Sequence, residues 1–263
     1  VTALDPQGFQ VATNIGHFQA ESVVIASGGL SIPTLGGSAI GYEIAKQYGH
    51  HIFPTRAGLV PFTFSDGFKE VTTRLSGNAV EATLSNDLNS FTEALLFTHR
   101  GLSGPSSLQL SNYWDVGQSF KIDFLPSVDL KDFLINKKKS QPKVLLRTLL
   151  TELLPKSVVL ELQNLIWLDQ ADTAIGNTSD EKLELIASRL NGFDVKPSGT
   201  EGYRTAEVTL GGVDTTEVSS KTMESKKQKG LFFVGEILDV SGHLGGYNFQ
   251  WAWASAHAAS QFV

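Results

Sequence analysis

The sequence of 263 residues contains no cysteine, which excludes disulfide bonds, thiolate metal sites and redox-active thiols. It contains no apolar run of the roughly 18–20 residues that a membrane-spanning helix needs. The motif GxSxG is also absent, which disfavours a serine hydrolase built on a nucleophile elbow. The adjacent histidines His50 and His51 point apart in a helix or a strand, so they do not indicate a metal site. We therefore expect no metal and no membrane partner.

Charge is modest and slightly acidic. Charged residues make up 18% of the sequence, hydrophobic residues 41%, and the net charge is −6. Proteins that bind nucleic acid over a broad surface usually carry a basic patch. The basic run at 137–139 is short and fits a solvated helix end. We therefore expect no nucleic-acid partner and, with no visible signal peptide, a cytoplasmic protein.

The last thirty-odd residues contain the densest pattern. The apolar run Leu231–Val234 predicts a buried strand, and Gly235-Glu236 puts a carboxylate at its carboxyl end. Gly245-Gly246 then precedes Asn248, a good N-cap for an Ala/Trp-rich helix. This order is typical of the crevice in which α/β proteins bind phosphorylated cofactors. A plain strand–turn–helix unit explains the same spacing equally well. The helix is apolar on nearly every side, so we expect it to be buried.

The first part of the chain predicts strands followed by one helix. In the segment Phe9–Thr13, every second residue is apolar or β-branched, which is typical of a strand. The chain can turn at 14–17, so that Phe18–Ala20 pairs back with this strand. A buried strand at 23–26 ends at Gly28-Gly29, and Ser38 is expected to cap a helix over about 39–48 with Gly49 as its C′ residue.

The middle of the chain predicts a small antiparallel sheet or barrel and then a helix cluster. The expected strands are 60–64, 71–75, 79–84, 91–98 and 120–124, and the expected helices are 129–139, 143–154, 156–168 and 179–190. Within the predicted sheet region, the segment Thr98–Pro105 has two interpretations. A loop leading into a helix is favoured over a site in which His99, Arg100 or Ser103 contacts a ligand. The buried-strand pattern returns at 206–210 and 231–234, so the middle is expected to be an insertion.

Five blocks together resemble the YhiN/BaiN-type flavoproteins, also described as aminoacetone-oxidase-family FAD-binding enzymes. They occur in that family's order, span most of the chain and are specific as a set. The blocks are Val23–His50, Leu95–Ser111, Ala206–Val213 with Thr222–Lys226, Gly235–Val240, and Gly245–Trp253.

The resemblance implies an α/β fold: a two-part FAD/NAD(P)-binding, Rossmann-like domain with an inserted β-barrel plus helical domain. The expected pieces of the FAD-binding domain are 1–57 and 204–263. The insertion is expected at 58–203, with a β subdomain over 58–125 and a helical subdomain over 126–203. The implied activity is that of an FAD-dependent oxidoreductase acting on a small organic substrate, with NAD(P)H as one candidate partner.

The resemblance also implies a cofactor site. Glu236 would accept hydrogen bonds from the ribityl chain or a ribose hydroxyl, and the N–H groups of Gly246–Asn248 would face the pyrimidine edge of the flavin. Asp239 would contact the cofactor or hold the loop. No general acid or base is assigned, and His243 is interpreted as structural or solvent-facing. The full set of expected cofactor-binding residues is Ser27, Gly28, Gly29, Gly212, Gly235, Glu236, Asp239, Gly245, Gly246, Tyr247, Asn248 and Phe249.

One feature of the family is missing. No GxGxxG motif occurs, and the chain starts at Val1 without an initiator Met. We interpret the sequence as the carboxyl-terminal two thirds of a flavoprotein that lacks its first FAD-binding unit, and we expect this fragment to be inactive and to bind FAD far more weakly than the family does. The missing unit, or another copy of the chain, is then an expected partner. The alternative is a non-catalytic globular fragment that does not retain FAD.

Overall fold

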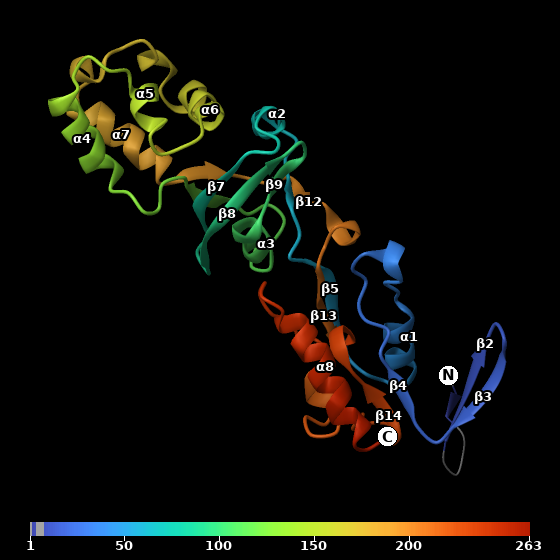
Figure 1. Cartoon of the computed structure of the whole chain (residues 1–263). Coiled ribbons are helices and arrows are strands. Elements are labelled where there is room, and N and C mark those ends of the chain that lie inside the picture. Colours follow the sequence, from blue (N-terminus) through green and yellow to red (C-terminus); the bar gives the residue numbers. More distant parts are fainter. Residues whose placement is uncertain (1, 4–7) are drawn as a thin grey trace. The chain divides into compact units, whose positions relative to one another are not determined.

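The computed structural model describes residues 2–3 and 8–263; the predicted first strand segment also includes residues 1 and 4–7, which lie outside this range. The chain forms two compact units (Figure 1). The split unit comprises Val1–Val60 and Glu201–Val263, and the continuous unit comprises Pro61–Thr200. In the described part of the chain, no helix has the length and apolar character needed to cross a membrane.

The split unit begins with an antiparallel meander of three strands, β1 (Thr2–Ala3), β2 (Phe9–Thr13) and β3 (Gly16–Ala20). Val11 pairs with Phe18, and Gly16 adopts φ 142° after the turn, a value that favours glycine. The predicted hairpin is therefore confirmed.

Two further strand pairs form the centre of the split unit. β4 (Val23–Ile25) runs parallel to β14 (Leu231–Phe233), which confirms that these distant segments share one sheet. β5 (Ile52–Gly58) runs antiparallel to β13 (Val208–Val213), with a register shift between Leu210 and Gly212. Phe232 and Phe233 are buried in the core of this unit.

Two α-helices complete the split unit, α1 (Ile40–Gln47) and α8 (Tyr247–Ser260). The hydroxyl of Ser38 accepts from the N–H of Ile40 at 3.3 Å, and Gly49 adopts φ 74° after the helix, so the predicted ends of α1 are confirmed. Four short 3₁₀ turns lie in the connections: η1 (Pro33–Leu35), η4 (Gly202–Arg204), η5 (Thr215–Glu217) and η6 (Gly235–Ile237).

Helix α8 differs from its prediction in two ways. Its N-cap is Gly246, and the side chain of Asn248 bonds the loop residue Gly242 instead of capping the helix. The helix is also not buried on all sides, because Phe249 is 77% and Trp253 75% exposed. The fully buried positions of α8, Ser255 and Ala259, carry small side chains, while Phe249 and Trp253 lie on the opposite face.

The continuous unit contains a seven-stranded sheet with strand order β11-β10-β7-β8-β9-β6-β12. The prediction of a closed barrel is wrong: within the described residues no ladder joins the edge strands β11 and β12. These strands are very short, and Pro197 in the three-residue connection between them lacks an N–H for a ladder. The strands are β6 (Phe62–Thr63), β7 (Ala79–Ser85), β8 (Ser90–Thr98), β9 (Gly101–Ser103), β10 (Phe120–Asp123), β11 (Phe193–Val195) and β12 (Gly199–Thr200).

The segment 71–75, predicted as a strand, is mostly helical and belongs to α2 (Gly67–Arg74). Asp66 accepts from the N–H of Phe68 at 3.1 Å and starts the helix, an N-cap signal that outweighs the β-branched residues that follow. Helix α3 (Pro105–Ser111) starts at Pro105 after Gly104, as the favoured interpretation of 98–105 expects.

Helices α4 to α7 form the predicted cluster (Figure 1). Their apolar faces share one core with the seven-stranded sheet, with Trp167 completely buried. The elements are α4 (Leu130–Ser140), α5 (Leu146–Leu150), α6 (Lys156–Ile166), η2 (Leu168–Gln170), η3 (Ile175–Asn177) and α7 (Asp180–Leu190).

Candidate functional site

A pocket of about 390 Å³ lies in the split unit, beside the carboxyl end of β14 and the turn that leads into α8. This volume is within the range of small-molecule sites. Most of the wall is apolar, and four side chains carry charge or polar groups: Glu207, Glu236, His243 and Asn248. The lining residues are Ile32, Leu59, Glu207, Val208, Glu236, Val240, His243, Leu244, Gly245, Gly246, Asn248, Phe249, Trp251 and Ala252.

Two residues in the pocket wall have an unusual backbone. Ile32 has φ 47° and Leu59 has φ 45°, and Met223 is the only other non-glycine residue with positive φ in the described chain. This conformation is costly for a side chain with a Cβ, most of all for β-branched isoleucine. Such strain collects at functional sites, where the surrounding structure maintains it. Because the residue types show no sign of it, sequence reasoning missed both positions.

The carboxylate of Glu236 connects three segments at the pocket. One oxygen accepts from the N–H of Gly29 at 3.1 Å, and the other accepts from the N–H of Thr209. Glu236 lies on η6, Gly29 follows β4, and Thr209 lies on β13. The side chain predicted to bind a cofactor hydroxyl therefore also holds the local fold together.

The turn after β4 depends on glycine. A Cβ on Gly29 would lie 2.4 Å from the Thr209 hydroxyl oxygen, closer than any real contact. That oxygen accepts from the N–H groups of Leu30 at 2.8 Å and Ser31 at 3.2 Å, so it cannot easily move. Gly28 adopts φ 69°, and a Cβ there would be 3.9 Å from Glu236. The predicted glycine turn is thus explained by close packing on Glu236 and Thr209.

The start of α8 is open on one side and anchored on the other. Gly246 adopts φ 87°, and a Cβ built on it would meet no atom within 4 Å. On the anchored side, the N–H of Gly235 donates to Ser255 at 2.9 Å, and the indole of Trp251 donates to the carbonyl of Gly235 at 3.1 Å. The amide N–H groups of a helix's first turn have no partner inside the helix and attract electron-rich groups.

The expected site residues are only partly gathered at the pocket. Glu236, Gly245, Gly246, Asn248 and Phe249 line it, with Phe249 mostly exposed at its edge. Gly28 and Gly29 adjoin Glu236 without lining the pocket. The others outside the lining are Ser27, Gly212, Gly235, Asp239 and Tyr247.

Two of the residues outside the lining have a packing explanation. A Cβ on Gly212 would lie 2.6 Å from the carbonyl oxygen of Ile237, so this glycine lets β13 pack against η6. Asp239 is exposed, and its N–H donates to the carbonyl of Val213 at 2.9 Å. Both residues help to join β13 to the segment after β14.

A buried tyrosine lies close to the Glu236 carboxylate. Tyr42 on α1 is 5% exposed, and its hydroxyl has no hydrogen-bond partner. Burial raises the pKa of Tyr42, and the negative charge of Glu236 raises it further. Tyr42 therefore stays protonated, as a buried neutral hydroxyl.

The pocket combines apolar walls with a carboxylate and main-chain N–H groups. Its apolar walls can cover ring faces, the open space above Gly246 admits a ligand close to main-chain N–H groups, and Glu236 can accept from hydroxyls. Among the described residues no group of three or more His, Asp or Glu side chains could hold a metal ion.

Comparisons with known proteins show the family of the chain. Residues 1–262 match the family model "HI0933-like protein Rossmann domain". The chain is 49% identical over 260 residues to the "Ribosomal RNA dihydrouridine synthase" of Escherichia coli (strain K12), covering 98% of the chain and 64% of that protein. It is 46% identical over 256 residues to the protein of the same name from Haemophilus influenzae, covering 96% of the chain and 62% of that protein.

A more distant relative has a different substrate in its name. The chain is 30% identical over 275 aligned residues to the "3-dehydro-bile acid delta(4,6)-reductase" of Clostridium scindens, covering 98% of the chain and 66% of that protein. The chain thus spans about two thirds of the length of these curated relatives.

Proposed function

Because the chain belongs to the HI0933-like Rossmann-domain family, we propose that it is the larger part of an FAD-dependent oxidoreductase. The observation that carries this proposal is the pocket at the start of α8, which combines apolar walls, a carboxylate and an open glycine turn. In this proposal the pieces 1–57 and 204–263 bind the cofactor, and the insertion over 58–203 contributes to substrate access.

The split unit would bind the flavin end of FAD. The N–H groups of Gly246–Asn248 would hold its electron-rich pyrimidine edge, because the positive end of the helix dipole stabilises negative charge there. Glu236 would accept from a cofactor hydroxyl with the carboxylate lone pairs that Gly29 and Thr209 leave free. Ser27, Gly28, Gly29, Gly212, Gly235, Asp239, Tyr247 and Phe249 complete the proposed set, most of them by shaping the turns around this carboxylate.

The relatives' names suggest one common reaction class. Dihydrouridine is uridine with two hydrogens added across the C5=C6 bond, which is conjugated to a carbonyl. A reductase of a 3-oxo compound with double bonds at positions 4 and 6 also acts on carbon–carbon bonds conjugated to a carbonyl. We therefore propose a two-electron reduction of such a bond, in which reduced flavin supplies the hydride and an acid supplies the proton.

The proposed substrate is a uridine in ribosomal RNA, since the two more similar relatives carry that substrate in their names. This replaces the expectation that nucleic acid is not a partner. That expectation rested on the net charge of −6, which describes the whole chain and not the surface around one pocket. One base extruded into a pocket can be recognised by stacking and hydrogen bonds. NAD(P)H is the proposed source of reducing equivalents.

Two measurements test the proposal. The chain is titrated with FAD, FMN and riboflavin, and quenching of flavin fluorescence reports binding; uptake of FAD supports the cofactor assignment. The whole protein that contains the chain is then incubated with NAD(P)H and unmodified ribosomal RNA, and mass spectrometry looks for uridines that have gained two hydrogens. Binding of FAD without this product would refute the substrate, whereas no flavin binding by the whole protein would favour the non-catalytic alternative.

A further inference from the structure

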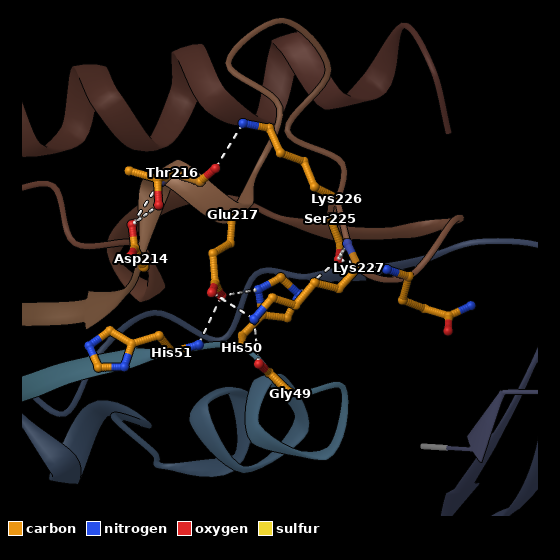
Figure 2. Close-up of polar contacts among 10 residues, drawn as sticks. Gly49, His50, His51, Asp214, Thr216, Glu217, Ser225, Lys226 and Lys227 are labelled. Atoms are coloured by element: carbon orange, nitrogen blue, oxygen red, sulfur yellow. Dashed lines mark hydrogen bonds and ion pairs between the residues drawn. The ribbon is translucent and has the colours of Figure 1, made fainter.

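A buried histidine fastens the connection between β13 and β14 to the corner between α1 and β5 (Figure 2). The side chain of His50 is completely buried. Its Nδ1 lies 3.1 Å from Oε2 of Glu217, and its Nε2 lies 2.7 Å from Oγ of Ser225. Glu217 is the last residue of η5, and Ser225 lies later in the connection. The ring of His50 therefore bonds the β13–β14 connection at two points.

The chemistry of the partners determines the direction of each hydrogen bond. An ionised carboxylate only accepts, so Nδ1 of His50 carries the proton that Glu217 receives. Nε2 is then unprotonated and accepts from the hydroxyl of Ser225. The same hydroxyl oxygen accepts from the N–H groups of Lys227 and Gln228, both at 3.0 Å. The neutral Nδ1–H tautomer of His50 therefore satisfies every group in the cluster.

The order serine, histidine and glutamate is that of a nucleophilic triad, but the surroundings argue against that role. Both lone pairs of the Ser225 oxygen are used by main-chain N–H groups, and the residue is 6% exposed. A nucleophile needs a free lone pair and access to its substrate. The cluster is therefore suited to holding the chain in place.

We propose that His50 is a proton-sensitive clasp, whose neutral form holds the β13–β14 connection closed and whose protonated form releases it. Protonation places a second N–H on Nε2, opposite a hydroxyl whose lone pairs are already used. The hydroxyl proton of Ser225 then loses its acceptor. At least one of the hydrogen bonds at the Ser225 hydroxyl must then break, which weakens the hold on this part of the connection.

The charged groups at the ring are Glu217 and Lys227. Glu217 faces it from η5, and the ammonium of Lys227 lies 2.6 Å from Oε1 of the same carboxylate. The main-chain N–H of the neighbouring His51 also donates to Oε2 of Glu217, at 2.8 Å. β14 contributes an uncharged contact, the ring of Phe233 at 4.9 Å. Glu217 keeps its hydrogen bond from Nδ1 when the ring is protonated, but it shares its negative charge with Lys227 and the N–H of His51, so it offsets the buried charge only in part.

Burial, the largest influence, lowers the pKa of His50; Lys227 lowers it as well, while Glu217 acts in the opposite direction. The clasp therefore stays closed at neutral pH and opens in acid. Its opening reaches β14 directly, because the N–H of Ser225 donates to the carbonyl of Leu231 at 2.7 Å. This inference needs no cofactor and goes beyond the proposed function.

The test uses the unmodified chain first. Nitrogen-15 NMR of labelled histidine should show His50 as the Nδ1–H tautomer at about pH 7.5, still neutral below about pH 6.5. Amide exchange of residues 215–230, corrected for intrinsic rates, should become at least roughly tenfold faster as His50 protonates. The Nε2–H tautomer, or titration of His50 with unchanged exchange, would overturn the proposal.

Two variants separate the clasp from general acid sensitivity. His50→Gln carries no titrating ring, so its exchange at 215–230 should no longer depend on pH in this range. His17→Gln, which replaces an exposed histidine on β3, should keep the wild-type dependence. Wild-type pH dependence in His50→Gln would contradict the role of His50, and the NMR result on the unmodified chain decides the matter if that variant does not fold.

Discussion

Glu236 accepts a hydrogen bond from the main-chain N–H of Gly29 at 3.1 Å, although the two residues lie 207 positions apart. This bond joins the turn after β4 to the turn after β14, and the bond from Thr209 adds β13. The two segments of the split unit are thus held together at the pocket itself. A substitution at Glu236 is expected to affect both stability and cofactor binding.

Glu236→Ala should lower the free energy of unfolding of the split unit by ~1–3 kcal/mol, because two partly buried N–H groups lose their acceptor. Glu236→Gln keeps one acceptor oxygen and should cost less. Urea unfolding followed by the fluorine signal of fluorotryptophan at Trp251 reports on this unit. Unchanged stability in Glu236→Ala would restrict the residue to ligand binding. In the whole protein, we expect the same substitution to weaken FAD binding by ~1–3 kcal/mol, measured by calorimetry.

Gly29→Ala should destabilise the split unit by ~1–3 kcal/mol, because the new methyl group would be forced against Thr209. The added Cβ would lie 2.4 Å from the hydroxyl oxygen and 2.7 Å from the Cβ of that residue. Gly67→Ala is the control, since a Cβ there meets nothing within 4 Å. If both variants unfold at the urea concentration of the wild type, the turn after β4 is more adaptable than the packing indicates.

Gly246→Ala should weaken flavin binding, whereas its loss of stability should be no larger than that of a control glycine-to-alanine variant. The methyl group would enter the open space at the start of α8, where we propose the flavin edge lies. Gly77→Ala is a matched control, because Gly77 also has positive φ, 91°, and open space around its Cβ position, so the backbone cost is similar. Fluorescence titration of both variants with FAD makes the comparison. Equal affinities would place the flavin elsewhere.

The pairing of β4 with β14 and the helix cluster were predictable from the sequence. Apolar runs and turn residues correctly predicted that β4 and β14 share a sheet, because a run buried on both faces needs a partner strand. The helix cluster followed from apolar residues at three- and four-residue steps. Apolar runs and three- and four-residue spacings can both be recognised within short stretches of the sequence.

The details of the pocket wall were not predictable in the same way. The positive φ angles of Ile32 and Leu59 depend on tertiary contacts, and nothing in a β-branched or leucine residue suggests them. The role of Gly212 also depends on a distant carbonyl, that of Ile237. Helix α2 was not predicted, because its β-branched residues favour a strand and that signal is stronger in the sequence than the N-cap signal of Asp66.

Tyr42→Phe should leave the stability of the split unit unchanged or raise it by up to about 1 kcal/mol. The substitution removes a buried hydroxyl that has no hydrogen-bond partner, and with it a desolvation cost. Ser107→Ala is the contrast, because that buried hydroxyl donates to the carbonyl of Leu102 at 3.0 Å and should cost about 1 kcal/mol. Urea unfolding measures both. A clear loss of stability in Tyr42→Phe would show that a water molecule or ligand bonds the hydroxyl beside Glu236.

The free energy of unfolding of the split unit should decrease as the pH is lowered through the range in which His50 titrates. Its pKa is lowered in the folded chain, chiefly by burial, so the unfolded chain binds the proton more tightly. The stabilisation is therefore complete above the unfolded pKa, about 6.5, and is lost as the pH falls toward the folded pKa. The slope contributed by one proton is at most about 1.4 kcal/mol per pH unit.

His50→Gln separates this contribution from those of the carboxylates. Glu217 and Asp214 also have lowered pKa values, through Lys227 and Thr216 respectively, so their stabilisation is lost only at lower pH, below their unfolded values of about 4. Between about pH 6.5 and pH 4.5, urea unfolding should show a decline in the wild type that is absent from His50→Gln. Parallel declines in the two proteins would mean that His50 protonates without cost to the fold. A wild-type stability that rises toward pH 4.5 would mean that Glu217 stabilises the imidazolium by more than burial and Lys227 disfavour it, which would contradict the lowered pKa of His50.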